Sequence, residues 1–483
     1  MTTVLEATAV VSSAKAQEPK ILQTLFEQQR AAFTADPVPD YKTRIAHLQK
    51  LKRVLLDHRD EIAAAINKDF AGRSVDETFL AELMPIAHNI DYCCKNLRKW
   101  MKPSRRKVGL QLQPAKAVVY YQPLGVVGVI APWNYPMMLA VSPAVAALAA
   151  GNRVMIKMSE YTPTIAELFV RLIADHFPAD LITVVQGDVD VATAFSKLPF
   201  DHLLFTGSTA VGRIVMKAAA DNLTPVTLEL GGKSPAIICT DTDLEEAAAR
   251  ICFGKSFNAG QTCVATDYVL CPSDKIEVFI ESYRRAFAQM YPRLANNDDY
   301  TSIISKRFYD RLNHLVAEAE AAGANVYTIG EQGINDGSRR LPIRILTNVP
   351  DHVTVMQEEI FGPILPIVPY DTLGDALDYI NDRPRPLALY LFSDDANCQQ
   401  RVLEHTRSGG VCFNETLLHV AVDDMPFGGI GASGMGHYHG HEGFLTFSKA
   451  RSTLSKGKFN GAKFIFPPYG GAIGQMIYKL FLR

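Results

Sequence analysis

Short apolar runs alternate with stretches of helical periodicity between Val126 and Leu230. Strands buried in a parallel sheet form continuous apolar runs, and helices cross back between them, so this alternation predicts βαβ units and an α/β fold. An open parallel sheet binds its ligands beyond the carboxyl ends of its strands. We expect strands at 126–130, 154–156, 182–185 and 203–205 and helices at 137–150 and 211–220, with strand ends that carry Pro132-Trp133-Asn134, Lys157, Gly187 and Thr206-Gly207-Ser208.

The rest of the chain shows other patterns. Residues 21–101 have helical spacing with a break at 36–39, and residues 108–122 form two extended runs around a proline, which predicts a hairpin. The capping-box pattern at 242–245 predicts the start of a helix that runs toward Asn258, with Cys263 in the following loop. Further strands and helices are expected to about residue 393, and glycine-rich loops after it.

Composition narrows the classes of function. A chain of 483 residues is expected to form about two or three packed units. Its 49 basic and 51 acidic residues lack the positive excess of nucleic-acid binders, so no nucleic-acid partner is expected. Its eight cysteines contain no C-x-x-C pair, which argues against a disulfide framework and a metal site and favours a reducing compartment, the cytoplasm.

The two ends of the chain differ in character. Residues 1–20 do not have the pattern of a signal peptide and are expected to form a loose tail. The last apolar stretch, 473–482, is too short to cross a bilayer. Its apolar residues Met476, Ile477, Leu480 and Phe481 share one helical face, and we favour docking on the protein's own core over peripheral membrane contact or a cap on a neighbouring subunit.

Two residues in glycine-bearing loops point to acyl-enzyme chemistry. Cys263 is a candidate nucleophile, and an electropositive, partly accessible setting would lower the pKa of its thiol. Glu229 ends an apolar run before two glycines, and a partly desolvated carboxyl there would have a raised pKa suited to activating water. The alternatives are an inert buried thiol, which we expect for the other seven cysteines, and a carboxylate that caps a backbone amide.

Three further motifs are weaker evidence of function when each is taken alone. Asn134, in a turn held by two prolines, offers an amide donor for an oxyanion, although such a residue is often just a turn residue. The segment 207–212 lies between a strand and a helix and is either a phosphate-binding loop or a tight turn. Lys157 and Glu160 follow a strand end and are either ribose ligands or solvated charges.

Together these motifs resemble the aldehyde dehydrogenase superfamily over residues 21–448 in order and spacing. The segments 132–136, 383–390 and 434–440 resemble the class 3 branch of this superfamily. Within that branch, the sequence most resembles the coniferyl aldehyde dehydrogenases.

The resemblance implies NAD(P)-dependent oxidation of a hydrophobic or aromatic aldehyde, such as coniferyl aldehyde, to the carboxylic acid through a thiohemiacetal and a thioester on Cys263. Asn134 and the Cys263 backbone amide would hold the oxyanion, and Glu229 would activate the water. The residues implied in cofactor binding are Trp133, Lys157, Glu160, Phe205, Gly207, Ser208, Val211, Gly212, Glu359 and Phe361.

The resemblance also implies an architecture. A cofactor domain with a Rossmann-like parallel sheet (21–107 and 123–229) would be followed by an α/β catalytic domain (230–436). A β-hairpin oligomerisation arm (108–122 and 437–460) and a C-terminal tail (461–483) complete the chain. Class 3 relatives are usually dimers, so a homodimer is implied, and the unpaired edges of an exposed hairpin give a physical reason for it.

Two positions depart from the family pattern. Met158 stands where the family usually has proline, and Thr266 stands where class 3 members often have proline. The first departure leaves NADP open as cofactor, but Glu160 would repel a 2′-phosphate and favours NAD.

Two alternatives belong to other classes of function. An acylating enzyme would pass the acyl group to coenzyme A, but a water activator such as Glu229 would hydrolyse the thioester first. A non-catalytic nucleotide-binding protein should have lost Cys263 or Glu229, and both are present. The aldehyde itself is not named by the sequence, although Tyr135 and residues 417–422 are candidate walls of its tunnel.

Overall fold

A computed structural model describes residues 19–109, 112–331, 338–458, 463 and 466–482. Helices cover the first part of this range, and the expected break separates the first two of them. Asp40 ends the break by capping the second helix, because its carboxylate accepts a hydrogen bond from the Thr43 amide. The expected loose tail, 1–20, lies outside the described residues except for its last two residues, which already belong to a helix. The helices are α2 (Pro19–Ala35), α3 (Tyr41–Asp57), α4 (Arg59–Phe70), α5 (Val75–Thr78), the π-helix η1 (Phe79–Leu83) and α6 (Met84–Trp100).

The first sheet has the predicted parallel strands, each at its predicted position. The chain passes outward from β3 through β4 to β5 and then crosses back to β6 and β7, so the strand order is β15-β7-β6-β3-β4-β5 and reverses between β3 and β6. The strands are β3 (Val126–Ile130), β4 (Arg153–Lys157), β5 (Ile182–Val185), β6 (His202–Thr206), β7 (Val226–Glu229) and the short antiparallel β15 (Gly434–Met435).

Helices cover this sheet as the predicted βαβ units require. α7 packs between the sheet and α3 and α6, which explains why it is apolar all round and buried along nearly its whole length. The apolar faces of the other helices close the core on both sides of the sheet. The helices are α7 (Met138–Ala150), α8 (Pro163–His176), α9 (Val189–Ser196) and α10 (Thr209–Ala220).

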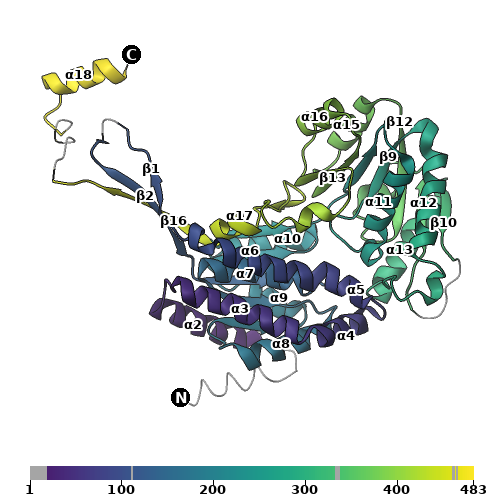
Figure 1. The fold of residues 1–483 in the computed structure, drawn as a ribbon, viewed down its shortest axis with the longest axis horizontal. Coiled ribbons are helices and arrows are strands. Elements are labelled where there is room, and N and C mark those ends of the chain that lie inside the picture. Colours follow the sequence, from purple (N-terminus) through teal and green to yellow (C-terminus); the bar gives the residue numbers. More distant parts are fainter. Residues whose placement is uncertain (1–18, 110–111, 332–337, 459–462, 464–465, 483) are drawn as a thin grey trace.

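A second α/β unit follows, and Figure 1 shows it beside the first. Its seven-stranded sheet has the order β10-β11-β12-β9-β8-β13-β14 and is parallel except for β10. The strands are β8 (Pro235–Ile238), β9 (Tyr268–Pro272), β10 (Asn325–Ile329), β11 (Ile343–Thr347), β12 (Ile364–Tyr370), β13 (Ala388–Phe392) and β14 (Gly410–Phe413). The helices are α11 (Leu244–Ser256), η3 (Phe257–Gly260), η4 (Ser273–Lys275), α12 (Ile276–Met290), η5 (Leu294–Asn296), α13 (Lys306–Ala321), α14 (Thr354–Gln357), α15 (Leu373–Asn381), α16 (Ala396–His405) and η6 (Leu418–Ala421). The later helix α17 (Gly440–Thr446) packs on α6 and α7 of the first unit.

Two local predictions in this unit were wrong. The cap of α11 is Asp243, whose carboxylate accepts from the amides of Glu245 and Glu246, and not Thr242, at which the capping-box pattern begins. The region after residue 393 also holds α16 and β14, where only glycine-rich loops were expected. Glycine at the start of β14 concealed a strand that pairs with β13.

A three-stranded antiparallel sheet projects from the body as an arm (Figure 1). It consists of β1 (Ser104–Arg106), β2 (Lys116–Pro123) and β16 (Ser448–Ser455), in the order β1-β2-β16. The predicted hairpin at 108–122 was therefore wrong in its first strand, which lies earlier in the chain; residues 110–111 lie outside the described part. The first strand, β1, is short and basic and pairs with β2 at the edge of the sheet. The prediction relied on an apolar run and therefore missed this strand.

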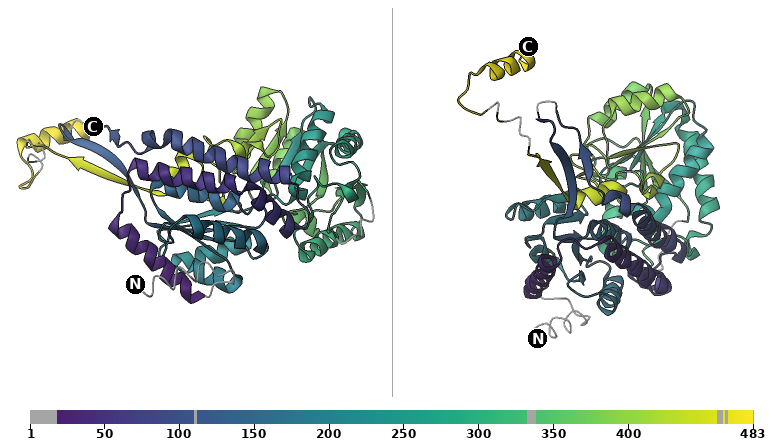
Figure 2. Two further views of the ribbon diagram at one scale, coloured as in Figure 1. Left: turned by 60° about the horizontal axis from the view of Figure 1, so that its bottom comes forward. Right: turned by 60° about the vertical axis from the view of Figure 1, so that its left-hand side comes forward.

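The predicted docking of the C-terminal helix on the protein's own core was also wrong. α18 (Ala472–Phe481) lies at the far end of the arm, away from both α/β units (Figures 1 and 2). Met476 is 64% exposed and Leu480 is 62% exposed. An amphipathic pattern predicts that a helix packs against another surface, but it does not identify that surface. Here β16 leads the chain away from the core, so α18 cannot pack on it. Among the helices that the structure describes, none combines the length and apolarity needed to span a membrane.

Candidate active site

The expected site residues gather at one edge of the first sheet. The loop 131–137 follows β3, Lys157 ends β4, residues 207–208 follow β6 and Glu229 ends β7. These strands are parallel, so their carboxyl ends lie on the same edge, and the β3 and β6 loops flank the point where the strand order reverses. The loop that carries Cys263 reaches this edge from the second unit.

Glu229 is a buried carboxyl group with no partner. The residue is 3% exposed, and neither carboxylate oxygen has a hydrogen-bond partner among the described residues. Burial raises its pKa well above the ordinary value. The alternative interpretation, a carboxylate that caps a backbone amide, therefore does not hold.

Cys263 and Glu229 lie close enough to interact electrostatically. Burial raises the pKa of the Cys263 thiol to about 12, the carboxylates of Glu359 and Glu229 add to the rise, and the amides of Cys263 and Val264 oppose it. Burial also raises the pKa of Tyr438 well above its ordinary value, and Glu229 and Cys263 add to that rise. The expected electropositive setting was wrong, because the groups that act on the thiol are carboxylates, which raise its pKa.

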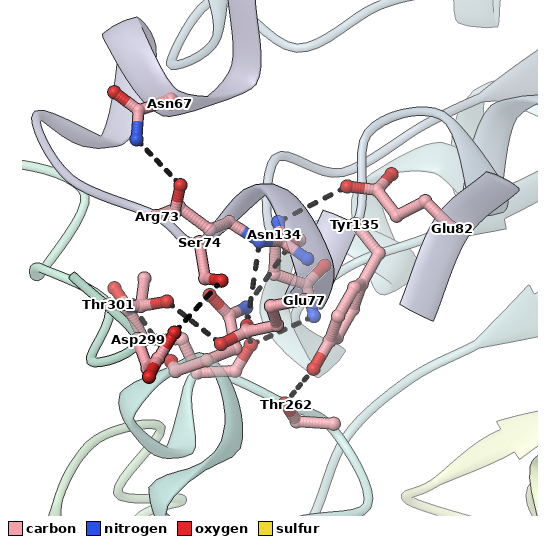
Figure 3. Close-up of polar contacts among 12 residues, drawn as sticks. Asn67, Arg73, Ser74, Glu77, Glu82, Asn134, Tyr135, Thr262, Asp299 and Thr301 are labelled. Carbon is pink, nitrogen blue, oxygen red and sulfur yellow. Dashed lines mark hydrogen bonds and ion pairs between the residues drawn. The ribbon is translucent and has the colours of Figure 1, made fainter. Parts of the chain in front are cut away.

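Asn134 lies against the loop that carries Cys263. Its side-chain amide donates to the carbonyl of Gln261 (3.1 Å), and the neighbouring Tyr135 hydroxyl bonds the Thr262 hydroxyl (2.7 Å). An amide nitrogen has two hydrogens, so one remains for a further acceptor. Asn134 is 3% exposed and its backbone carbonyl is held by Arg73 and Asn258, so this is more than a turn residue (Figure 3).

The segment 207–212 joins β6 to α10 as the sequence predicts. Ser208 caps α10, because its hydroxyl accepts from the amide of Val211 (3.4 Å). A side chain at Gly207 would lie 2.5 Å from the ring of Phe205, and one at Gly212 would lie 2.7 Å from Leu230. Both glycines thus allow close backbone packing at the N-terminus of a helix, the geometry that suits an anionic phosphate group.

Lys157 and Glu160 form an ion pair with a distance of 3.2 Å between the ammonium nitrogen and a carboxylate oxygen. The alternative of two solvated charges is wrong for Lys157, which is 2% exposed. Burial lowers the pKa of Lys157, and Glu160 and Asp188 oppose the change. Glu160 remains exposed enough to reach a ligand at this strand end.

Glu359 and Phe361 lie at the same site although they come from the second unit. Burial raises the pKa of Glu359 to about 8, Asp267 adds to the rise, and the amide of Gly232 opposes it. One of its carboxylate oxygens has no partner among the described residues. Phe361 contacts the ring of Trp133 at a centroid distance of 5.3 Å.

Sequence reasoning missed several residues of this site. Tyr438 was not singled out, although Glu229 and Cys263 both contribute to the rise of its pKa, and Arg73 was not noticed in a helical region of ordinary composition. Only the break between two helices around a glycine could have drawn attention to Arg73. A cavity of about 140 Å³ lies beside His439, and the residues that line it include Leu80, Met84, Met138, Val420, Ala421, Asp423 and His439.

Comparison with known proteins identifies this arrangement. The family model "Aldehyde dehydrogenase family" matches residues 6–453. The chain belongs to the aldehyde dehydrogenase family. It is 58% identical over 467 residues to a probable coniferyl aldehyde dehydrogenase of Pseudomonas aeruginosa, covering 97% of this chain and 98% of the relative.

Solved structures agree with this assignment. The substrate-bound state of Staphylococcus aureus AldH superimposes with a TM-score of 0.90 at 37% identity, covering 95% of this chain and 99% of that one. A Mycobacterium tuberculosis aldehyde dehydrogenase complexed with NAD+ superimposes with a TM-score of 0.83 at 28% identity, covering 92% of both chains. The resemblance drawn from the motifs and the predicted α/β aldehyde dehydrogenase fold are thereby confirmed.

Proposed function

We propose that this aldehyde dehydrogenase oxidises a hydrophobic or aromatic aldehyde to the carboxylic acid through a thioester on Cys263. The observation that carries the proposal is the unpartnered, buried Glu229 carboxyl, which interacts electrostatically with the Cys263 thiol. A carboxyl group without a hydrogen-bond partner is costly to bury and is retained where it acts on another group.

The chain's own residues supply the acyl-transfer steps. The Cys263 thiol loses its proton to solvent as its sulfur bonds to the carbonyl carbon, and the resulting oxyanion accepts from the Asn134 amide and the Cys263 backbone amide. After loss of a hydride the carbon–oxygen double bond reforms as a thioester. Glu229 then takes a proton from water as the water oxygen bonds to the carbon. It gives this proton to the sulfur as the carbon–sulfur bond breaks, which releases the acid and the thiol.

A dinucleotide fits the residues at the sheet edge. The glycines of the 207–212 segment leave space at a helix N-terminus, Lys157 and Glu160 are placed for ribose hydroxyls, and Glu359 has a free buried oxygen. The bound nicotinamide would supply the hydride acceptor. Glu160 favours NAD over NADP by repulsion of a 2′-phosphate; the NAD+ complex of the mycobacterial relative supports the same choice.

Coniferyl aldehyde is the first candidate substrate, because the Pseudomonas aeruginosa relative carries that name. The apolar side chains of Val420 and Ala421, which belong to the expected tunnel wall, line the cavity of about 140 Å³, and apolar walls suit a hydrophobic substrate.

We further propose a homodimer in a reducing compartment such as the cytoplasm. β16 is an exposed edge strand on an arm that projects from the body, which leaves its backbone groups open to a partner strand. All eight cysteines are unpaired, as a reducing compartment requires.

The test is a panel of aliphatic, aromatic and cinnamyl aldehydes, each run with NAD and with NADP while reduced nicotinamide is followed. We expect the Cys263→Ala variant to lose turnover and the Cys94→Ala variant, which removes another partly exposed thiol, to keep it. Normal turnover in Cys263→Ala would refute the proposal. Acyl-coenzyme A formation in an assay supplied with coenzyme A would favour the acylating alternative.

A further inference from the structure

Arg73 is a fully buried arginine whose polar side-chain partners belong to the Asn134 loop or hold the two loops of the proposed site. Its guanidinium donates to the backbone carbonyl of Asn134 (2.9 Å) and forms ion pairs with Glu82 (3.2 Å) and Glu77 (3.5 Å). Figure 3 shows these groups converging between the helical segment and the Asn134 loop.

Glu82 extends the contact along the Asn134 loop. Its second carboxylate oxygen accepts from the amides of Met137 (2.7 Å) and Met138 (3.1 Å), where α7 begins. Arg73 therefore holds the loop at Asn134, and its counter-ion holds the same loop three and four residues later. One ion pair thus holds the loop at its middle and at its C-terminal end.

Glu77 extends the contact to the loop that carries Cys263. Its carboxylate accepts from the Thr301 hydroxyl (3.0 Å) and from the backbone amide of Asn258. The side chain of Asn258 in turn donates to the carbonyls of Asn134 and Gln261, both at 3.1 Å. The two loops thus share one buried charge cluster.

The aromatic ring of Tyr135 adds a third connection. The Arg73 guanidinium lies over the rings of Phe70 and Tyr135, at 5.0 Å and 4.9 Å from their centroids. The Tyr135 hydroxyl bonds the Thr262 side chain, next to Cys263.

The helix that carries the two carboxylates is irregular where they sit. Glu77 and Glu82 are five residues apart, and Glu82 lies in the π-helix η1, which closes with a bond from the Met84 amide to the Phe79 carbonyl. Such i to i+5 turns occur frequently at functional sites, and this one lets both carboxylates reach the same guanidinium. A buried ion cluster contributes little net stability compared with apolar packing, so stability alone does not account for this one.

We propose that Arg73 is a positioning residue that, with Glu77 and Glu82, sets the Asn134 amide against the Cys263 loop for the oxyanion step. This proposal rests on the proposed function and adds a residue that does not touch the aldehyde or the cofactor.

The test compares Arg73→Lys with Arg44→Lys. Arg44 is a matched control, because it is 2% exposed and its guanidinium also donates to backbone carbonyls. Two of these carbonyls, those of Ala149 and Ala150, lie at the opposite end of α7, and the third belongs to Pro39. We expect Arg73→Lys to lower kcat about tenfold or more with the KM values nearly unchanged, since a misplaced oxyanion donor acts on the transition state. Arg44→Lys should keep kcat per folded molecule.

A double-mutant cycle separates positioning from a merely structural role. Asn134→Ala should lower kcat by about 10²–10³-fold in the native background but less than about tenfold in Arg73→Lys, because the donor is already misplaced there. Its effect in Arg44→Lys should equal that in the native background. If Arg73→Lys does not fold, Glu82→Gln takes its place in the same cycle, since it removes the charge that anchors Arg73.

Two results would overturn the positioning role: equal kcat per folded molecule in Arg73→Lys and Arg44→Lys, or an undiminished effect of Asn134→Ala in Arg73→Lys. Failure of the native protein to oxidise any aldehyde would refute the proposed function instead.

Discussion

Substitution of Gly231 by alanine should displace Glu359 from the proposed cofactor site. A Cβ atom at position 231 would lie 2.1 Å and 2.3 Å from the two carboxylate oxygens of Glu359, whereas unstrained contacts between heavy atoms lie near 3.5 Å. The carboxyl group must therefore move by about 1 Å or more. It is the end of a flexible side chain, so the fold adapts while the hydrogen bond to a ribose hydroxyl is lost.

The expected loss of affinity follows from that one bond. A buried hydrogen-bonding group left unsatisfied costs about 1–3 kcal/mol, which corresponds to about 5–150-fold weaker NAD binding. Isothermal titration calorimetry with NAD measures the dissociation constant, and urea unfolding measures the remaining stability. Glu359→Ala should weaken binding by a similar factor, whereas Glu358→Ala, which removes a neighbouring carboxylate that is 64% exposed, should not.

The two substitutions should not be additive. In the Glu359→Ala background the clash has disappeared, so Gly231→Ala should change NAD affinity by less than about twofold. Unchanged NAD affinity in the single Gly231→Ala variant, or the same loss in both backgrounds, would refute the reasoning that connects Gly231 to the cofactor through Glu359.

Two further predictions concern stability. Burial lowers the pKa of His202 to about 4, below its unfolded value of 6.5, so the unfolded chain binds more protons between these values and stability falls as the pH drops. Between about pH 6.5 and pH 5 the native protein should lose about 1.5 kcal/mol more unfolding free energy than His202→Gln in urea titrations, and equal losses would contradict this. Deletion of residues 457–483 should change the unfolding free energy by less than about 0.5 kcal/mol, because the α18 side chains are exposed, and a loss of about 2 kcal/mol or more would show that they pack on the body.

The sequence predicted the first sheet and the place of the site because both depend on local patterns. The run at 126–130 is buried on both faces, which requires continuous apolar residues, and parallel strands bring their carboxyl ends to one edge. Asn134, Lys157 and residues 207–208 could therefore be placed together from the chain alone.

The remaining parts of the site depend on contacts between distant segments. Arg73 meets Asn134 and Glu359 meets Gly231 across more than fifty residues, and no local pattern records such a contact. The same limit explains the wrong expectation for the Cys263 thiol, because the loop around it is uncharged and the carboxylates that surround it come from other elements. The position of α18 could not be predicted because an amphipathic pattern does not identify its partner.

Trapping of the acyl-enzyme in Glu229→Gln tests the central claim most directly. Glutamine keeps the size of the side chain and cannot take a proton from water, so one equivalent of reduced nicotinamide should form and the acyl group should remain on the protein. Intact-mass and peptide mass spectrometry after reaction with coniferyl aldehyde and NAD should locate the added acyl mass on the peptide that contains Cys263. Continuous turnover by Glu229→Gln at the native rate, or an acyl mass on any other residue, would contradict the account.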